Sequence, residues 1–166
     1  LLSPEDNLLQ VSIHTAKHSY FRAPGFRLHL DVKRVTSYFD IDWTIFLEKV
    51  NKANTKTAVY FSLYLSKKFL NADVPEFVLD NLKPILLKRA LINFCFRNFS
   101  LNERFYFKKH EFILFQISLY DSFSDVLQVA FPPKDIIKIK YEKRFLLTGY
   151  FTHLLDLIGI RRKFKK

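Results

Sequence analysis

Three ionisable side chains lie close together near the start of the sequence: His14, Lys17 and His18. On a helix, residues i and i+4 share a face, so the two histidines have a spacing that suits a shared metal ion. The run His-Thr-Ala-Lys-His lacks the glutamate that follows the first histidine in zinc-dependent hydrolases, and Lys17 repels a cation. We therefore predict no metal site here. We expect the histidines to form hydrogen bonds at an interface or to contact an anionic ligand.

Two acidic features follow along the chain. Asp31 lies beside the apolar stripe of a second expected helix, where it can pair with a histidine or a nearby arginine, or face a ligand. The triplet Asp40-Ile41-Asp42 has the D-x-D spacing that binds magnesium in nucleotidyl transfer, a chemistry that needs a strand and a phosphate-holding loop. The sequence has no Gly-Ser pair or glycine-rich loop, and the triplet joins two expected helices. We interpret Asp42 as a helix N-cap and predict no catalytic residue in this chain.

Hydrophobic periodicity and capping residues predict helices along the whole chain. Ser3, Asp42, and either Asn54 or Thr55 are expected N-caps, and Asp121 or Ser122 is expected to begin a short helix. The segment 134–143 fits either a strand or a helical turn. The expected helices cover about residues 4–20, 26–39, 43 onward, 56 onward, 75–82, 84 onward, 101–119, 122–130 and 145–160.

The fold class that follows is all-α, a multi-helix bundle of eight or nine helices with short loops. We expect one helical domain over residues 1–160 and a basic tail at 161–166. Apolar positions mark the faces expected to be buried. The first expected helix has two such faces, one with Leu9, Ile13, Ala16 and Tyr20 and the opposite one with Val11, His14, His18 and Phe21.

Three later helices each have one apolar stripe. The helix at 26–39 has Leu28, Val32, Val35 and Phe39, the helix from 84 onward has Leu87, Leu91, Phe94 and Cys95, and the helix at 145–160 has Leu147, Phe151, Leu154 and Ile158.

Composition narrows the class of protein. With 49% hydrophobic residues and 19 phenylalanines the chain can bury a real core, and only three glycines argue against a turn-rich β sandwich. A single cysteine, Cys95, excludes an internal disulfide and a cysteine-based zinc site. No apolar run is long enough to span a bilayer and no signal peptide is recognisable, so we expect a cytoplasmic protein. Because the sequence lacks methionine, we expect it to be part of a longer chain.

Positive charge is unevenly distributed. The chain carries a net charge of +11, and the segment from Lys134 to Lys166 holds ten basic and three acidic residues, a net charge of +7. Such an end attracts nucleic acid or anionic lipid, although a solvated tail has the same composition. A basic helical module that binds nucleic acid, or one that binds another protein, is therefore an alternative function.

Several short motifs occur together in a recognisable order. They are Ser3-Pro4-Glu5-Asp6, His14-Thr15-Ala16-Lys17-His18, Leu30-Asp31-Val32, Ile41-Asp42-Trp43, Val74-Pro75-Glu76, Phe131-Pro132-Pro133, Tyr141 and His153-Leu154-Leu155. Over residues 3–160 this order resembles the C-terminal helical half of nucleotidyltransferase family 5, whose members are similar to the minimal nucleotidyltransferases of the polymerase-β type.

The resemblance implies that a separate N-terminal α/β domain carries the Gly-Ser motif and the metal-binding acids. This chain would then be the helical, non-catalytic partner of that domain and would hold no cofactor itself. The full-length protein would use Mg²⁺ and a nucleoside triphosphate to transfer a nucleoside monophosphate to an acceptor. The positions that match the helical pattern are His14, Lys17, His18 and Asp31. The resemblance implies that they face the catalytic domain or touch the nucleotide or acceptor.

Overall fold

The computed structural model describes residues 2–18, 27–96, 109–141 and 146–157, and these residues form helices joined by short connections. The all-α prediction is confirmed. The segment 134–143, which fitted either a strand or a helix, is helical from Lys134 to Tyr141. The helices are α1 (Pro4–His18), α2 (Leu28–Tyr38), α3 (Trp43–Lys52), α4 (Lys56–Leu70), α5 (Glu76–Leu82), α6 (Leu86–Cys95), α7 (Lys109–Ser118), α8 (Phe123–Ala130), α9 (Lys134–Tyr141) and α10 (Leu146–Leu157).

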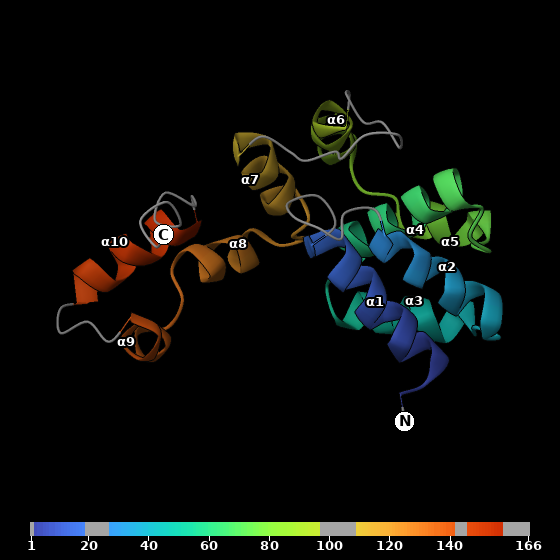
Figure 1. Cartoon of the computed structure of the whole chain (residues 1–166), viewed down its shortest axis with the longest axis horizontal. Helices are drawn as coiled ribbons and strands as arrows, with labels where there is room; N and C mark the ends of the chain where they lie inside the picture. The colour runs from blue at the N-terminus through green and yellow to red at the C-terminus, as the bar shows by residue number, and fades with distance from the viewer. Residues whose placement is uncertain (1, 19–26, 97–108, 142–145, 158–166) are drawn as a thin grey trace. The chain divides into compact units, whose positions relative to one another are not determined.

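The chain divides into two compact units, residues 1–121 and residues 122–166. In the first unit, α1 packs against α2, α3 and α4, α2 packs against α4, and α5 returns along α4 (Figure 1). In the same unit α6 pairs with α7. In the second unit α10 packs against α9 and α8. The end of the expected domain at residue 160 and the expected basic tail lie outside the described residues.

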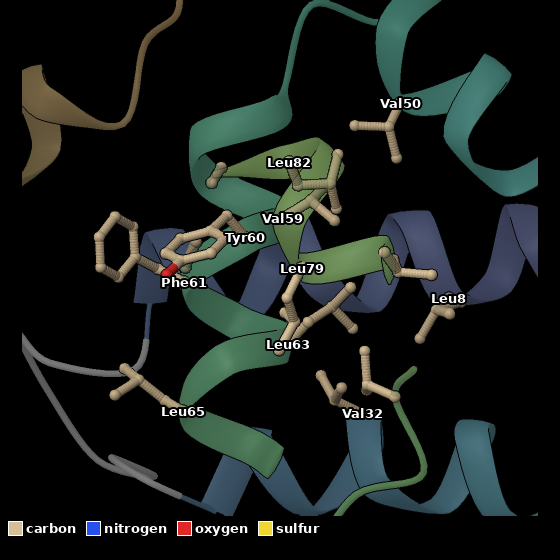
Figure 2. Close-up of a cluster of buried hydrophobic side chains, with 14 of the residues drawn as sticks. Leu8, Val32, Val50, Val59, Tyr60, Phe61, Leu63, Leu65, Leu79 and Leu82 are labelled. Carbon is tan, nitrogen blue, oxygen red and sulfur yellow. The ribbon is translucent and has the colours of Figure 1, made fainter. Parts of the chain in front are cut away.

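Helix α4 is the centre of the first unit because it is buried on almost every side. Nine of its residues, Thr57 to Leu63 together with Leu65 and Ser66, are buried. Figure 2 shows this cluster, in which Val59, Tyr60 and Leu63 of α4 lie among Leu79 and Leu82 of α5 and Leu8 of α1. A helix that is apolar on most of its circumference belongs in the interior of a bundle.

Local capping chemistry was predicted correctly at three helix starts. The backbone N–H of Asp6 donates to Ser3 Oγ at 3.2 Å, which caps α1. Asp42 accepts from the backbone N–H groups of Thr44 and Ile45 at 2.9 and 3.0 Å, which caps α3. Ser122 does the same for α8 through the N–H of Ser124. Each cap satisfies an amide that the helix itself leaves unpaired.

The predicted cap of α4 is wrong. Thr55 occupies the N-cap position but its side chain makes no capping hydrogen bond. The carboxylate of Asp121 takes this role, because it accepts from the Thr57 backbone N–H at 3.1 and 3.2 Å and from the Thr57 hydroxyl. Lys88 of α6 donates to the same carboxylate at 3.3 Å and to the Tyr120 carbonyl at 2.7 Å. The N-terminal cap of the central helix α4 is therefore supplied by a side chain 64 residues away in sequence.

Several predicted buried faces are only partly correct. On α1 the buried positions are Leu8, Ser12, Thr15 and Ala16, with Leu9 and Ile13 only partly buried at the side. Two hydrogen bonds cross this face: Thr15 Oγ1 donates to the Leu28 carbonyl, and Ser62 Oγ of α4 donates to the Ser12 carbonyl at 2.6 Å. The buried Ser12 hydroxyl itself has no partner among the described residues. Because the side chains on this face are small, α1 can pack closely against α2 and α4. The face of α1 in this contact is less apolar than the face predicted from the sequence.

The predicted α2 stripe is confirmed at Val32 and Val35, which are buried, and wrong at Phe39, which follows the helix and is exposed. On α6 the predicted Leu87 and Phe94 are exposed, whereas Ile92 is buried. On α10, Leu147 and Phe151 are exposed while Thr152 and His153 are buried. The described helices include no segment long and apolar enough to cross a membrane.

Candidate functional site

The three basic residues predicted on the first helix lie together at the exposed C-terminal end of α1. His14, Lys17 and His18 are all exposed. The two imidazole rings are tilted against each other with centroids 4.7 Å apart. The Lys17 carbonyl accepts a hydrogen bond from Gln116 Nε2 at 3.1 Å, which ties this last turn to α7. The structure thus brings these three predicted residues onto one turn that presents cationic and hydrogen-bonding groups to solvent.

The charges around His18 favour its neutral form. Partial burial lowers the pKa of His18, and the neighbouring charges of His14 and Lys17 lower it further. A negatively charged ligand close to this turn would act in the opposite direction, because it would stabilise the protonated ring. The charge of this turn therefore depends on what lies beside His18.

Asp31 lies on the neighbouring helix α2 and pairs with an arginine, one of the alternatives expected from the sequence. Arg34 Nη1 lies 3.4 Å from Asp31 Oδ1, and both side chains are largely exposed. Asp31 also lines a surface pocket of about 330 Å³ with Arg27, Leu28, Leu30 and Arg34. Two guanidinium groups beside one carboxylate are suited to bind a phosphate or a carboxylate, since arginine donates in a planar fork.

The first turn of α2 and the last turn of α1 are held next to each other. The link is the hydrogen bond from Thr15 Oγ1 to the Leu28 carbonyl at 3.2 Å. The α1 turn that bears His14 and His18 is therefore a neighbour of the α2 turn that bears Arg27. We define the basic turn pair as His14, Lys17 and His18 at the end of α1 together with Arg27 and Arg34, which line the pocket at the start of α2.

The D-x-D triplet has no metal-binding arrangement in the described structure. Asp42 uses its carboxylate as the N-cap of α3, as predicted, and the Asp42 backbone N–H donates to Glu5 Oε1 at 3.2 Å. Asp40 is exposed and lines a separate depression of about 420 Å³ with Trp43 and Asp73. Among the described residues no group of three or more histidine, cysteine, aspartate or glutamate side chains could hold a metal ion.

No role was predicted for His29 of α2, which is fully buried in the described part of the first unit. Its side chain has no exposed surface, and Nδ1 lies 2.9 Å from Ser66 Oγ of α4. Burial lowers the pKa of His29 to about 3, although a hydrogen bond with the Ser62 backbone opposes the shift. His29 therefore links α2 to α4 in its neutral form. The wheel position beside Val32 and Thr36 is the signal that could have identified it.

A groove between α4 and α5 was also missed from the sequence. It has a volume of about 320 Å³, and eight residues line it: Tyr60, Tyr64, Lys67, Lys68, Glu76, Leu79, Asp80 and Lys83. We call it the α4–α5 groove. On its α4 side the lining residues Tyr60, Tyr64 and Lys68 are each four positions apart, so they lie on one face of the helix. That stripe of two aromatic rings and a lysine was the available signal.

The comparison with known families places a match on the helices just described. The family described as uncharacterised nucleotidyltransferase matches residues 1–71, which span α1 to α4. This match supports relatedness to that family. It covers the first part of the 3–160 range over which the resemblance was expected. No curated protein and no solved structure matches the chain.

The matched segment contains every residue of the predicted site. His14, Lys17 and His18 lie on α1 and Asp31 lies on α2, within residues 1–71. The α4 side of the α4–α5 groove lies within the match, whereas α5 follows it.

Proposed function

We propose that this chain is the helical, non-catalytic part of a nucleotidyltransferase. The observation that carries the proposal is the family match over α1 to α4, the helices that bear the basic turn pair. The proposed reaction moves a nucleoside monophosphate from a nucleoside triphosphate to an acceptor. The acceptor hydroxyl gives up its proton to solvent and its oxygen bonds to the α-phosphorus. The bond from that phosphorus to the bridging oxygen of the β-phosphate breaks, and pyrophosphate leaves. Mg²⁺, supplied with the nucleotide, stabilises the charge on the leaving oxygens.

In this proposal the catalytic acids and the phosphate-holding loop belong to a separate nucleotidyltransferase domain of the same protein. His14, Lys17, His18 and Asp31 face that domain or the bound nucleotide. The exposure of His14, Lys17 and His18 supports this role, because a helical face that meets a nucleotide needs accessible donors and positive charge. The carboxylate of Asp42 is engaged in a helix cap, which supports assigning the metal-binding acids to another segment.

The experiment compares this chain with a longer product of the same gene. About 200 residues before Leu1, a typical domain length, are first read for a strand, a Gly-Ser pair and two acids one residue apart. Both proteins are then incubated with Mg²⁺ and α-³²P-labelled nucleoside triphosphates in a cell extract that supplies acceptors. The longer protein should release pyrophosphate and label an acceptor, and the 166-residue chain should not. Transfer by the chain alone, or no Gly-Ser motif and no transfer by the longer protein, would contradict the proposal.

A second candidate function is nucleic-acid binding, favoured by the surface of α9. Lys134, Lys138 and Lys140 are all exposed on this short helix. Phosphate-driven binding weakens steeply as salt rises, so a gel shift with single- and double-stranded oligonucleotides at 50 and 200 mM salt tests it. A shift that is lost at the higher salt concentration is the expected result, and no shift at the lower concentration would remove this candidate.

A further inference from the structure

We propose that the depression beside Trp43 binds a small organic cation, in which an ammonium or guanidinium group is carried on an apolar body. The depression has a volume of about 420 Å³, and eight residues line it: Thr36, Phe39, Asp40, Ile41, Trp43, Asp73, Val74 and Pro75. We call it the Trp43 depression. Its volume lies within the range of about 300–1,000 Å³ that is usual for small-molecule sites. This site does not depend on the proposed function.

The charge of the Trp43 depression is opposite in sign to that of the chain as a whole. Its ionisable lining residues are Asp40 and Asp73, whereas the chain carries a net charge of +11. The ion pairs of the described residues use other carboxylates, so neither charge is compensated. Asp73 Oδ2 accepts a hydrogen bond from Ser37 Oγ at 3.2 Å, which orients the carboxylate without neutralising it. The depression therefore attracts a cation.

One lysine reaches the wall of the depression but is already bound. Lys67 Nζ donates to the carbonyl of the lining residue Val74 at 2.7 Å and to Glu76 Oε1 at 2.6 Å. The charge of this ammonium is thus balanced by Glu76, which lies outside the Trp43 depression. Lys67 leaves the Asp73 carboxylate open to a ligand.

The rest of the wall is aromatic and aliphatic. Phe39, which follows α2, is 49% exposed, and Trp43 is partly buried at the start of α3. The face of an aromatic ring carries partial negative charge and attracts a cation. The side chains of Ile41, Val74 and Pro75 add aliphatic surface. An organic cation uses both parts of this wall, because its charged head meets carboxylates and rings while its apolar body covers the aliphatic side chains.

A metal ion fits this wall less well than an organic cation does. Magnesium and calcium take about six or more oxygen ligands. The lining side chains supply two carboxylates and the Thr36 hydroxyl, and that hydroxyl donates to the Lys33 carbonyl at 3.0 Å. Asp42, the other acid of the D-x-D triplet, uses its carboxylate to cap α3. Carboxylates also repel an anion, so the wall selects a cation with few requirements for oxygen ligands.

Local hydrogen bonds fix the segments that form the depression. The bond between Ser37 and Asp73 joins the end of α2 to the loop before α5. The Val74 backbone N–H donates to the Ala72 carbonyl at 2.9 Å, which tightens that loop. The cap formed by Asp42 fixes the start of α3 and with it the backbone of Trp43. A site whose segments are fixed before binding loses less conformational entropy when a ligand arrives.

The emission of Trp43 reports directly on this site, because Trp43 is the single tryptophan of the chain. The 166-residue chain is titrated with butylammonium chloride and with 1-butanol, which carries the same alkyl chain without a charge, and sodium chloride keeps the ionic strength constant. Butylammonium should change the emission in a saturable way, and 1-butanol should bind at least about fivefold more weakly. Saturation-transfer NMR of the butyl protons detects binding that leaves the emission unchanged.

Four variants test which side chains hold the cation. Asp40→Asn and Asp73→Asn keep the shape of the side chain and remove one charge, and each should raise the Kd for butylammonium about fivefold. Phe39→Leu removes a ring and should raise the Kd about threefold. The matched control is Asp80→Asn, an exposed aspartate of α5 outside the depression, which should change the Kd less than about twofold. Circular dichroism melts establish that each variant is folded before titration.

Several results would overturn the inference. If butylammonium gives no saturable signal in either measurement, the depression binds no such cation, and if 1-butanol binds equally well, the depression is merely apolar. Displacement of butylammonium by an equal concentration of magnesium chloride would indicate a metal site. An effect of Asp80→Asn as large as that of Asp73→Asn would indicate diffuse attraction. N-acetyl-lysinamide binding more than about tenfold more tightly than butylammonium would indicate a lysine of a partner protein in place of a small molecule.

Discussion

The buried histidine between α2 and α4 predicts a specific pH dependence of stability. His29 has a pKa of about 3 in the folded chain against an ordinary value of 6.5. Between these two values the unfolded chain binds a proton that the folded chain does not, so stability falls as the pH falls. The contribution of neutral His29 is fully present above about pH 6.5 and is lost progressively toward pH 3.

The size of the effect follows from the same two values. In that window each pH unit costs about 1.4 kcal/mol in the free energy of unfolding. Integration from pH 7 to pH 5 gives a loss of about 2 kcal/mol. His29 has no exposed surface, so solvent does not reduce this figure by screening the ring. A loss of about 2 kcal/mol is a large fraction of the 5–15 kcal/mol that is typical of a domain.

Carboxylates do not account for a change in this range. Hydrogen bonds lower the pKa of Glu5, chiefly from its own backbone N–H, and that of Asp6, chiefly from Lys49. Their ordinary values are 4.5 and 3.8, so their contributions are present above those values and are lost only as the pH falls below them. The interval from pH 7 to pH 5 therefore excludes these carboxylates, and the contribution of His18, whose pKa is also lowered, is common to the parent chain and to His29→Gln.

The assay is urea unfolding followed by the fluorescence of Trp43, the single tryptophan, which lies in the first unit and packs edge-on against Phe46 at 5.7 Å. Unfolding free energies are measured at pH 7, 6 and 5 for the parent chain, for His29→Gln and for the surface control His14→Gln. The parent and the His14 variant should lose about 2 kcal/mol, and His29→Gln should lose less than about 0.5 kcal/mol from a lower starting stability. Equal pH slopes in the parent and in His29→Gln would refute the reasoning.

Three further predictions concern helix ends and polar links. Asp42→Ala should destabilise the first unit by about 1 kcal/mol in urea unfolding, because the α3 cap is lost. Asp40→Ala, in the same D-x-D triplet, should change the unfolding free energy by less than about 0.5 kcal/mol. Equal effects of the two substitutions would contradict the capping role of Asp42. Asp121→Ala should cost about 2–3 kcal/mol in urea unfolding, because it removes the α4 cap and the carboxylate that pairs with Lys88. Asp121→Asn keeps an acceptor oxygen and should cost less. His153→Leu should lower the protection of α10 amides against hydrogen exchange by about tenfold, because the ring bonds to both the Tyr141 hydroxyl at 2.9 Å and the Val129 carbonyl at 2.8 Å; unchanged exchange would show that these bonds do not stabilise the helix.

The parts of the fold that could be predicted from the sequence are those fixed by neighbouring residues. Ser3 and Asp42 were placed correctly as caps, and Ser122 was one of the two residues expected to begin α8, because each bonds to an amide two or three residues away. The start of α5 beside Pro75 was predicted for the same reason, because the fixed φ of proline is compatible with the beginning of a helix. In each case the partner lies within one helical turn, so the sequence contains the whole interaction.

The parts that could not be predicted depend on distant partners. Nothing near Thr55 indicates that Asp121 caps α4, since the two segments meet only after α6 and α7 have folded back. The candidate site shows the same division. His14 and His18 could be paired by their spacing, whereas the groove needs α5 to lie along α4 before its lysines and carboxylates face one another.

The second unit shows why an apolar pattern alone can select the wrong face. Leu147 and Phe151 form the expected stripe of α10, yet they are 84% and 65% exposed, while His153 is buried. A unit of 45 residues can bury only a small apolar core, so specific polar links have a large share in its geometry. His153 uses both ring nitrogens to bridge α9 and the end of α8, and Tyr150 donates to the Pro132 carbonyl at 2.7 Å. A leucine can pack on either side of this helix, but a bridge to two fixed partners has only one orientation, and it sets the face that turns inward.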